Sequence, residues 1–461
     1  MNAPDERPTQ QTALEVPILF QATEERQIDE RLARRESLFD PDLIGSVHAL
    51  FERVRLTGDR ALLEATQEHD GVQLQSSVIP AAVVESAAQA LPTELRAAID
   101  VSRARIARVN EHCLTSDRIV EMEPGVRVGE LFRPLDSVAL WVPCRKGPLL
   151  STALMLTCAA RAAGVRRIVL MMPPRADGSA DPGTLAAGFL AGATEFQLGN
   201  GVALIAAATH GTASVQRVDG VFGPGPGGIA VAMGMAGMYG LKTVVGIGPT
   251  DCAVLADDSA DARLIAWDLA SEAEHGPDSA ALLVTPFEPL ARAVAAHLSE
   301  IIAASPALRR ANLERVFGSA GRGMLVVCPN FDAACALTAR FAPEHLSIVC
   351  RAELRELALS SAVAGEVLIG ESTPFAAANY AIGITAVLPT NGAARSISGI
   401  TARDMRRIMT FAELAPGALE LLGPTIQVLA DYEGLPNHAA AAKARYPERA
   451  KRALNPGQIN M

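Results

Sequence analysis

The chain has 461 residues, a formal net charge of -10 and 49% hydrophobic residues. This acidic balance argues against a nucleic-acid partner, because phosphate binding needs clustered lysine and arginine, and the length predicts about two or three domains. Neither a signal-peptide pattern nor about 18 uninterrupted apolar residues occurs, and the seven scattered cysteines contain no C-x-x-C pair. We therefore expect a cytoplasmic protein that does not contact membranes and acts on a small molecule.

Hydrophobic periodicity predicts the secondary structure in chain order. Apolar residues at every third or fourth position predict helices from about residue 24 to 115. From Ser137 onward, short β-branched runs alternate with alanine-rich helical stretches in two blocks, which predicts an α/β fold with two mostly parallel sheets. The predicted boundaries are 1–39 for a helical N-terminal arm, 40–139 with 252–400 for a discontinuous first domain, 140–251 for a second domain, and 401–461 for a helical C-terminal tail.

The glycine-rich stretch "GPGPGG", residues 223–228, formally satisfies the G-x-G-x-x-G pattern after a predicted strand. A phosphate cradle uses backbone N–H groups at a helix N-terminus, and Pro224 and Pro226 have none to offer. The stretch therefore favours a tight structural turn, with a phosphate site as the alternative.

Three short motifs contain histidine beside acidic residues or turns. In "SEAEHGP", Glu272 and His275 lie three residues apart on one face of a helix, where they can form either a metal-ligand pair or a solvated C-terminal turn. In "FAPEHLSI", adjacent Glu344 and His345 provide a carboxylate and an imidazole for acid and base chemistry, or serve only as packing. In "EGLPNH", Pro436 ends a helix and leaves His438 in a turn.

Taken in order, "GPTDCAVLAD", "SEAEHGP", "FAPEHL", "NYAIGITAVLPTNGAAR" and "YEGLPNHAAA" resemble histidinol dehydrogenase over about residues 25–445. The resemblance implies a homodimer, two incomplete Rossmann-like domains, one zinc ion per active site and NAD as oxidant of an alcohol through an aldehyde to an acid. It also implies that Glu344 is the base that activates water and that His345 takes the hydroxyl proton.

The same resemblance implies the metal ligands. Glu272 replaces the family's glutamine and Asn379 replaces its aspartate, while the histidines are kept as His275 and His438. We therefore predict one divalent ion, Zn²⁺ or Mn²⁺, on two imidazoles, a carboxylate and an amide. In the family the histidine at His438 reaches the metal of the other subunit, so the resemblance predicts an obligate homodimer with a shared active site.

Several substrate and cofactor positions differ from the family pattern. On the substrate side, Ala386 replaces a histidine, Thr250 replaces a serine and Glu433 is kept, so we expect a substrate other than histidinol. On the cofactor side, Ala203 replaces a glutamine, Pro226 replaces an asparagine, and Trp141 is the third position assigned to NAD. Two new basic residues follow Trp141 in "VPCRKG", Arg145 and Lys146, and could meet an anionic substrate or merely face water.

Two hypotheses follow from the sequence. The first is a metal-dependent, NAD-linked dehydrogenase of an alcohol or aldehyde other than histidinol. The second is a paralogue that has lost NAD binding and either performs nonredox metal chemistry or acts as a metal-stabilised binding protein. Fold analogy does not distinguish them.

Overall fold

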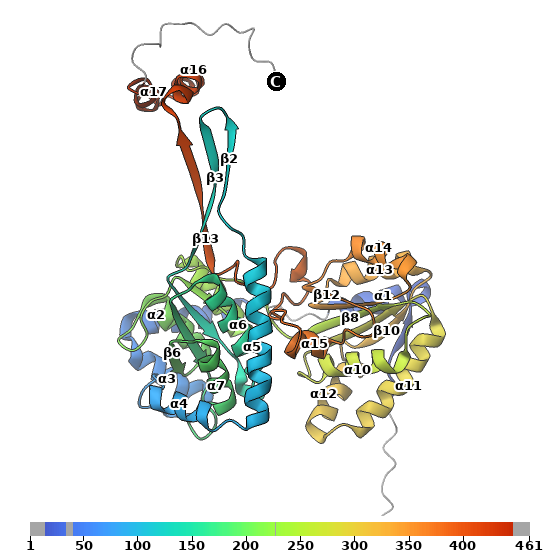
Figure 1. Ribbon diagram of the computed structural model, residues 1–461. Coiled ribbons are helices and arrows are strands. Elements are labelled where there is room, and N and C mark those ends of the chain that lie inside the picture. Colours follow the sequence, from blue (N-terminus) through green and yellow to red (C-terminus); the bar gives the residue numbers. More distant parts are fainter. Residues whose placement is uncertain (1–13, 34–39, 226, 446–461) are drawn as a thin grey trace, which may run out of the picture. The chain divides into compact units, whose positions relative to one another are not determined.

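The computed structural model describes residues 14–33, 40–225 and 227–445. In this part of the chain the strands form a six-stranded, a four-stranded and a three-stranded sheet (Figure 1). The two larger sheets belong to one compact unit, residues 1–114 with 135–405, and the three-stranded sheet belongs to a second unit, residues 115–134 with 406–461. The predicted α/β class is confirmed.

The six-stranded sheet has the strand order β1-β10-β9-β8-β11-β12, and every neighbouring pair is parallel. Along β8, Cys252 and Val254 face one hydrophobic core, whereas Ala253 and Leu255 face the other. This burial on both faces explains why the strands read as short, nearly continuous apolar runs. The strands are β1 Ile18–Phe20, β8 Asp251–Ala256, β9 Ala280–Thr285, β10 Met324–Val327, β11 His345–Val349 and β12 Glu366–Ile369.

Two groups of helices cover the faces of the six-stranded sheet (Figure 1). Helices α10, α11, α12 and α15 contribute to one core, and α1, α13 and α14 contribute to the other. No helix in the described ranges is long and apolar enough to cross a membrane. The helices are α1 Gln21–Ala33, α10 Ala262–Ala273, α11 Glu288–Ala304, α12 Ala307–Phe317, α13 Phe331–Phe341, α14 Ala352–Ser361 and α15 Phe375–Tyr380.

The four-stranded sheet is also parallel and has the order β6-β5-β4-β7. The chain leaves β4 toward β5 and β6 and later crosses to β7 on the other side, so the strand order reverses beside β4. Such a reversal is the usual place for a ligand crevice, at the carboxyl ends of the strands. The strands are β4 Ser137–Trp141, β5 Arg167–Met172, β6 Glu195–Leu198 and β7 Gly220–Phe222.

Helices from two distant parts of the chain cover the four-stranded sheet. One core includes residues of α4, α5, α6 and α7, and the other includes residues of α2, α3, α8 and α9. The helices are α2 Pro41–Thr57, α3 Asp59–Asp70, α4 Ala81–Gln89, α5 Thr93–Cys113, α6 Leu150–Ala163, α7 Pro182–Ala191, α8 Gly201–His210 and α9 Gly228–Met238, and short 3-10 turns span Cys144–Lys146 and Ala393–Arg395.

This arrangement differs from the predicted domain boundaries. Helices α2 to α5 were grouped with 252–400 in the prediction, but their apolar side chains, such as Phe51 and Ile99, enter the cores of the four-stranded sheet. Strand β4 also runs across the predicted boundary between residues 139 and 140. The N-terminal arm, predicted to be helical, contributes β1, which pairs in parallel with β10.

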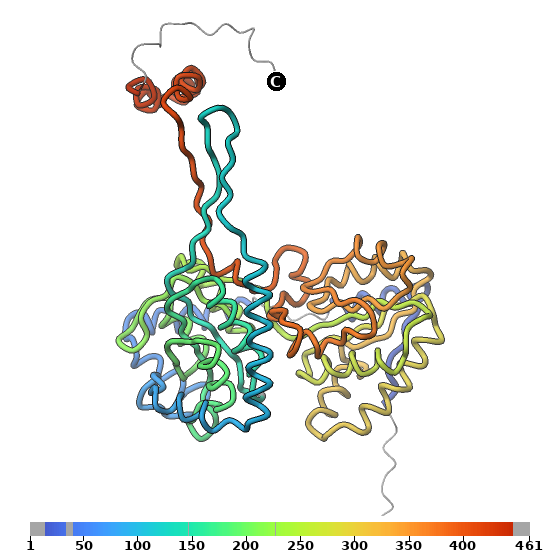
Figure 2. The backbone as a smooth tube through the Cα atoms, viewed as in Figure 1, coloured from blue at the N-terminus to red at the C-terminus, as the bar shows by residue number. Residues whose placement is uncertain are grey.

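The smaller unit contains the antiparallel sheet β13-β3-β2 and two helices (Figure 2). The prediction of a wholly helical tail is wrong for residues 406–414, because all nine residues pair with the full length of β3. The helices that follow agree with the prediction. The elements are β2 Arg118–Glu123, β3 Val126–Pro134, β13 Arg406–Leu414, α16 Pro416–Tyr432 and α17 Pro436–Lys443.

Candidate active site

The predicted catalytic pair lies at the amino end of β11. Helix α13 ends at Phe341. The residue that follows, Ala342, has a left-handed φ of 47° and turns the chain through Pro343 into Glu344 and the first strand residue, His345. Ala342 and Asn391 are the two non-glycine residues with positive φ among the residues described. A left-handed alanine costs on the order of 1 kcal/mol, and such strained residues often occur at functional sites.

A buried hydrogen-bond network holds Glu344. Its backbone N–H donates to Asp251 Oδ1 at 2.6 Å, and the Asp251 N–H donates back to Glu344 Oε2 at 3.3 Å. The N–H of Asn391 donates to the other Asp251 oxygen at 2.6 Å. Asp251 is the first residue of β8, so it ties the amino ends of β8 and β11 to the strained turn at Asn391.

The imidazole of His345 is 3% exposed and lies among three carboxylates. Nδ1 is 2.6 Å from Glu366 Oε1, whereas Nε2 is 3.6 Å from Glu344 Oε1 and 3.9 Å from Glu272 Oε2. The ring of Phe375 lies beside it, with centroids 5.7 Å apart. One ring nitrogen is therefore bound to a carboxylate, and the other faces the two remaining acids.

The electrostatics follow from this burial. Burial raises the pKa of Glu344 well above its usual range, opposed by His345 and assisted by Asp251 and Glu272. Burial lowers the pKa of His345, but the negative charges of Glu344, Glu272 and Glu366 outweigh it and raise that pKa to about 10. Perturbed groups of this kind are typical of sites that move protons.

Three of the four predicted metal ligands belong to the larger unit, and Glu272 links them. It is 1% exposed at the end of α10, and its Oε1 accepts a hydrogen bond from Asn379 Nδ2 of α15 at 3.0 Å. Its Oε2 is 3.6 Å from His275 Nε2 and has no hydrogen-bond partner. The His275 side chain is 41% exposed, so this edge of the cluster is accessible from solvent.

The geometry fits a divalent ion in part. Two ligand atoms on one tetrahedral zinc ion lie about 3.3 Å apart, close to the distance between Glu272 Oε2 and His275 Nε2. An unpaired buried carboxylate oxygen is also costly unless something binds it. Within the described ranges, however, no three His, Cys, Asp or Glu side chains are placed to hold a metal, so the amide of Asn379 and a further ligand are needed.

The remaining ligand and one substrate position belong to the smaller unit. His438 lies in α17 and Glu433 caps the end of α16, and both are exposed. Glu272 and His275 belong to the other compact unit. Of the other substrate positions, Thr250 directly precedes β8, and Ala386 is half-buried against the core of the four-stranded sheet.

Two of the three predicted cofactor positions, Trp141 and Ala203, lie near the carboxyl ends of the four-stranded sheet. Trp141 at the end of β4 is 4% exposed and Ala203 in α8 is fully buried, so neither presents its side chain to a dinucleotide in this conformation. A Cβ on Gly201 would lie 2.7 Å from the Trp141 ring, and one on Gly223 would lie 2.3 Å from the Trp141 carbonyl oxygen. Close packing explains these glycines without a phosphate, while Pro226 lies outside the described residues.

The new basic residues give little support to an anionic substrate. Arg145 forms an ion pair with Asp70 at 3.4 Å and donates to the His69 carbonyl at 3.2 Å. Its charge is therefore matched by a carboxylate of α3. The side chain of Lys146 lies outside the described part of the structure.

Comparison with known proteins agrees with this site. A family profile described as histidinol dehydrogenase matches residues 33–446. The chain belongs to the histidinol dehydrogenase family. It is 39% identical to histidinol dehydrogenase of Xanthomonas axonopodis pv. citri over 402 residues, which cover 87% of this chain and 92% of that protein. The Bacteroides fragilis protein is 34% identical, with 91% and 97% covered.

The fold gives the same assignment. The crystal structure of histidinol dehydrogenase from Elizabethkingia anophelis superposes with a TM-score of 0.87 and 26% identity, covering 94% of this chain and 98% of that one. As a member of a dehydrogenase family, the chain is an oxidoreductase acting on the CH–OH group of an alcohol. The predicted resemblance is thereby confirmed.

Two residues of this histidinol dehydrogenase-family site were missed in the sequence. Asp251 follows the noted Thr250, and Glu366 opens the apolar strand "GEVLIG". In both cases an acid is the first residue of a buried strand, which is unusual because a buried carboxylate needs a partner. That signal was available, although the partners are about 20 to 90 residues away along the chain.

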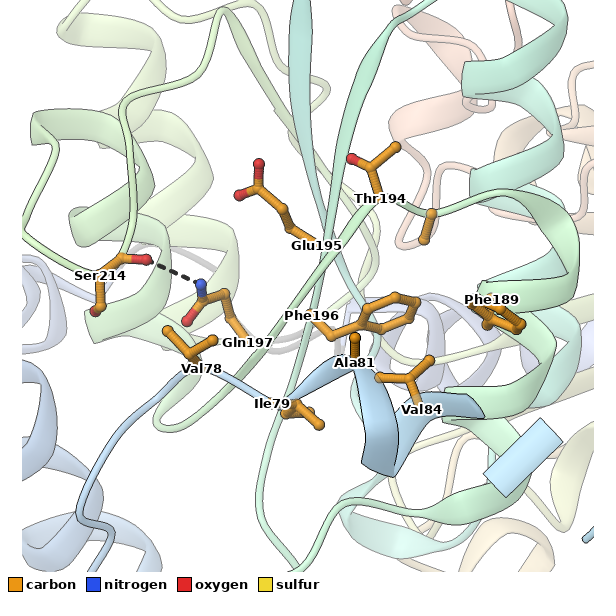
Figure 3. A pocket seen from close by; sticks show the side chains of 11 residues that line it. Val78, Ile79, Ala81, Val84, Phe189, Thr194, Glu195, Phe196, Gln197 and Ser214 are labelled. Carbon is orange, nitrogen blue, oxygen red and sulfur yellow. Dashed lines mark hydrogen bonds between the residues drawn. The ribbon is translucent and has the colours of Figure 1, made fainter. Parts of the chain in front are cut away.

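A cavity of about 340 Å³ lies elsewhere, beside the edge strand β6 (Figure 3). Its lining is mostly apolar, including Ile79 and Phe196, and the Gln197 amide donates to the Ser214 carbonyl at 3.0 Å. None of the predicted site residues lines this cavity. We therefore place the candidate active site at the amino ends of β8, β11 and β12.

Proposed function

We propose that this member of the histidinol dehydrogenase family is a metal-dependent, NAD-linked dehydrogenase that oxidises an alcohol or aldehyde other than histidinol. The observation that carries the proposal is the buried pair Glu344 and His345 beside Glu272 and His275. This pair offers two proton acceptors next to a carboxylate with an unsatisfied oxygen.

In this proposal His345 takes the proton of the substrate hydroxyl through Nε2. Glu344 takes a proton from water, so that the water oxygen adds to the aldehyde. Bound NAD would serve as the hydride acceptor in each oxidation, and a divalent ion held by Glu272 and His275 would provide a positive charge beside the substrate oxygen. The positive charge of the ion would also offset the negative charge of Glu272. This would favour the neutral form of the His345 imidazole, which a base requires.

We propose Glu272, His275, Asn379 and His438 of a second copy of the chain as the ligands of the ion, zinc or manganese. Glu272 and Asn379 together supply one carboxylate and one amide, as do the glutamine and aspartate that the resemblance places there. In this chain the carboxylate stands at residue 272 and the amide at residue 379, the reverse of the family pattern, and the two side chains hydrogen-bond to each other at 3.0 Å. The ligand set thus keeps its net charge.

Two replacements support a substrate other than histidinol. Ala386 has no group that can hydrogen-bond an imidazole, and Thr250 adds a methyl group where the family pattern has serine. A site built to bind a polar group loses much of its discrimination when that contact is removed. Glu433 remains available for a polar substrate group. We keep the proposal of an anionic substrate and assign its contact to Lys146, because Arg145 is already paired with Asp70.

We also propose an obligate homodimer. In the described part of the smaller unit, the buried apolar side chains are all alanines: Ala418, Ala430, Ala439 and Ala442. Large apolar side chains are exposed instead, including Leu421 at 74%, Val428 at 61% and Tyr432 at 92%. Exposed apolar surface of this kind marks interaction sites, and a second copy of the chain accounts for it.

One observation favours the alternative, a paralogue that has lost NAD binding. Trp141 and Ala203 are buried, so two of the positions assigned to NAD cannot contact it without rearrangement. For the dehydrogenase and for the alternative alike, we propose a cytoplasmic location. All seven cysteines carry free thiols, as is usual in a reducing compartment.

The deciding experiment uses the zinc-loaded wild-type protein and the variant His345→Asn. NAD and NADP are tested by calorimetry and by their effect on Tm, since a ligand that binds the native state stabilises it. A panel of histidinol, amino alcohols and hydroxy acids is then screened for nucleotide reduction.

We expect nucleotide binding in both proteins and turnover of a panel member other than histidinol by the wild type. Loss of a proton-transfer residue reduces the rate by about 10²- to 10⁴-fold, so the variant should be nearly inactive. If neither nucleotide binds and nothing is oxidised, the alternative replaces the dehydrogenase proposal.

A further inference from the structure

Glu366 lies directly opposite His345 in the parallel pair β11 and β12. Each is the first residue of its strand, so both side chains emerge at the amino edge of the six-stranded sheet. Side chains at such paired positions share a face of the sheet about 5 Å apart, close enough for a carboxylate to reach a ring. The distance from Glu366 Oε1 to His345 Nδ1 is 2.6 Å.

The backbone around Glu366 fixes this contact. The Glu366 N–H donates to the Glu344 carbonyl at 2.9 Å, and the Gly365 N–H donates to the Pro343 carbonyl at 2.9 Å. A Cβ on Gly365 would lie 2.6 Å from the Glu344 oxygen, so only glycine allows the strands to approach this closely. The backbone of Pro343 and Glu344, which leads into His345, therefore also positions Glu366.

The contact is dry and specific. The two side chains are 3% and 5% exposed, and Glu366 Oε2 has no partner, so this carboxylate makes its one described side-chain hydrogen bond to the imidazole. Charge-assisted hydrogen bonds of this length are strong and directional. Because a carboxylate accepts and cannot donate, it selects an imidazole that carries its proton on Nδ1.

We propose that Glu366 is a positioning residue that keeps Nδ1 of His345 protonated, so that Nε2 is the nitrogen that accepts the substrate proton. Nε2 is also the nitrogen that faces Glu344 and Glu272. While Nε2 holds the proton, the Glu366 carboxylate stabilises the resulting imidazolium, as in other carboxylate–imidazole pairs. The proposal rests on the role of His345 in the proposed function, but its geometry can be tested separately.

The first test is NMR of zinc-loaded full-length protein carrying ¹⁵N in both histidine ring nitrogens. His345→Asn identifies the signals of His345. In the wild type we expect a proton on Nδ1, with its resonance shifted far downfield by the short hydrogen bond. Glu366→Gln keeps an acceptor oxygen and should retain the Nδ1 proton with a smaller downfield shift, whereas Glu366→Ala should lose that downfield signal.

The second test is kinetic and uses any panel substrate that the wild type oxidises. Glu366→Ala should lower kcat by about 10- to 100-fold while KM changes little, because the loss affects orientation of the base rather than substrate binding. Glu366→Gln should recover part of this loss. Glu195→Gln is the matched control: it too opens a buried parallel strand, but it pairs with Arg167 in the other sheet and should leave kcat unchanged.

An unprotonated Nδ1 in the wild type, or an Nδ1 signal unchanged by Glu366→Ala, would overturn the proposal. So would equal kcat for the wild type and the folded alanine variant. If no panel substrate is oxidised, the proposed function fails instead, and the NMR result alone decides whether Glu366 holds the imidazole.

Discussion

Glu272 and Asn379 show how the chemistry of a site can be kept while its residues change. The two side chains share a hydrogen bond, and one Glu272 oxygen remains free toward His275. A metal site responds both to the number of carboxylates and to their arrangement. The pair should therefore behave as a unit rather than as two independent ligands.

We predict that Glu272→Gln lowers zinc affinity by about 10- to 100-fold, because the site loses its only carboxylate. Asn379→Asp should place a second carboxylate against Glu272. The double variant carries one acid and one amide again and should bind zinc nearly as well as the wild type. Competition with a chromogenic chelator measures each affinity. If the double variant lost as much zinc affinity as the two single variants together, the two positions would be independent.

Asp268 gives a pH prediction on the same helix. Burial raises its pKa to about 7, opposed by a hydrogen bond from the Phe375 backbone and assisted by the charge of Glu272. An unfolded aspartate titrates near pH 4, so between about pH 4 and 7 the folded state holds more protons than the unfolded state. Stability from this group is therefore complete below about pH 4 and is lost as the pH rises through 7.

Asp268→Asn removes that titration. The variant should exceed the wild type in unfolding free energy above pH 7, by on the order of 2 kcal/mol, and match it more closely at pH 5. Urea unfolding at several pH values measures the difference. Asp258→Asn is the control, because Arg351 lowers the pKa of that exposed carboxyl and no change of slope is expected between pH 5 and 8. A variant that tracks the wild type at every pH would contradict the assignment.

At the scale of single elements, helix α8 and strand β4 are locked together by a close contact. A Cβ on Gly201 would lie 2.6 Å from Ile229 Cδ1 and 2.7 Å from the Trp141 ring. Native cores do not yield easily to added atoms. The position of the Trp141 ring at the carboxyl end of β4 is therefore determined by α8.

Gly201→Ala should destabilise the protein by about 1–3 kcal/mol through overpacking. Gly234→Ala is the matched variant: this glycine lies inside α9 with nothing within 4 Å of an added Cβ, so it should gain about 0.5–1 kcal/mol from helix propensity. Urea midpoints at constant slope compare the two. A neutral Gly201→Ala would mean that the Trp141 ring moves readily, which would allow a nucleotide to reach the carboxyl end of β4.

The sequence predicts the elements well where the pattern is local. The alternation of strands and helices predicts both parallel sheets, and "FAPEHL" predicts Glu344 and His345 as a pair, whose side chains lie 3.6 Å apart in the structure. The strand at 406–414 was misread because "RRIMTFAEL" is rich in good helix formers and its partner β3 lies more than 270 residues upstream. Glu366 was missed for a similar reason, since its relation to His345 exists only in the register of β11 and β12.

At the scale of the whole molecule, the described part of the smaller unit, residues 115–134 and 406–445, has no hydrophobic core of its own. Its buried apolar residues are small, whereas α16 exposes Leu421 and Val428, seven residues apart on one face of the helix. A segment of this composition is stable only when another surface covers it. The dimer proposal therefore concerns stability as well as the supply of His438.

We predict that Leu421→Lys with Val428→Lys converts the dimer to a monomer or weakens it strongly, and lowers Tm by several degrees. Analytical ultracentrifugation at micromolar concentration gives the mass. Leu56→Lys alters a similarly exposed side chain of α2 in the larger unit and should change neither mass nor Tm. A wild-type monomer, or an unaffected dimer in the double variant, would refute this arrangement.

The pairing of β1 with β10 also sets an order for biosynthesis. Residues 18–20 leave the ribosome about 300 residues before their partner strand, which at roughly 5–20 residues per second is about 15–60 s. Every strand of the four-stranded sheet is made within that interval, since β7 ends at Phe222. All strands of the four-stranded sheet are therefore synthesised before β10, and the apolar segment Ile18–Phe20 has no partner strand during that time. A fusion at either end of the chain would leave this interval unchanged, because the interval depends only on the residues between the two strands, whereas an insertion between them would lengthen it.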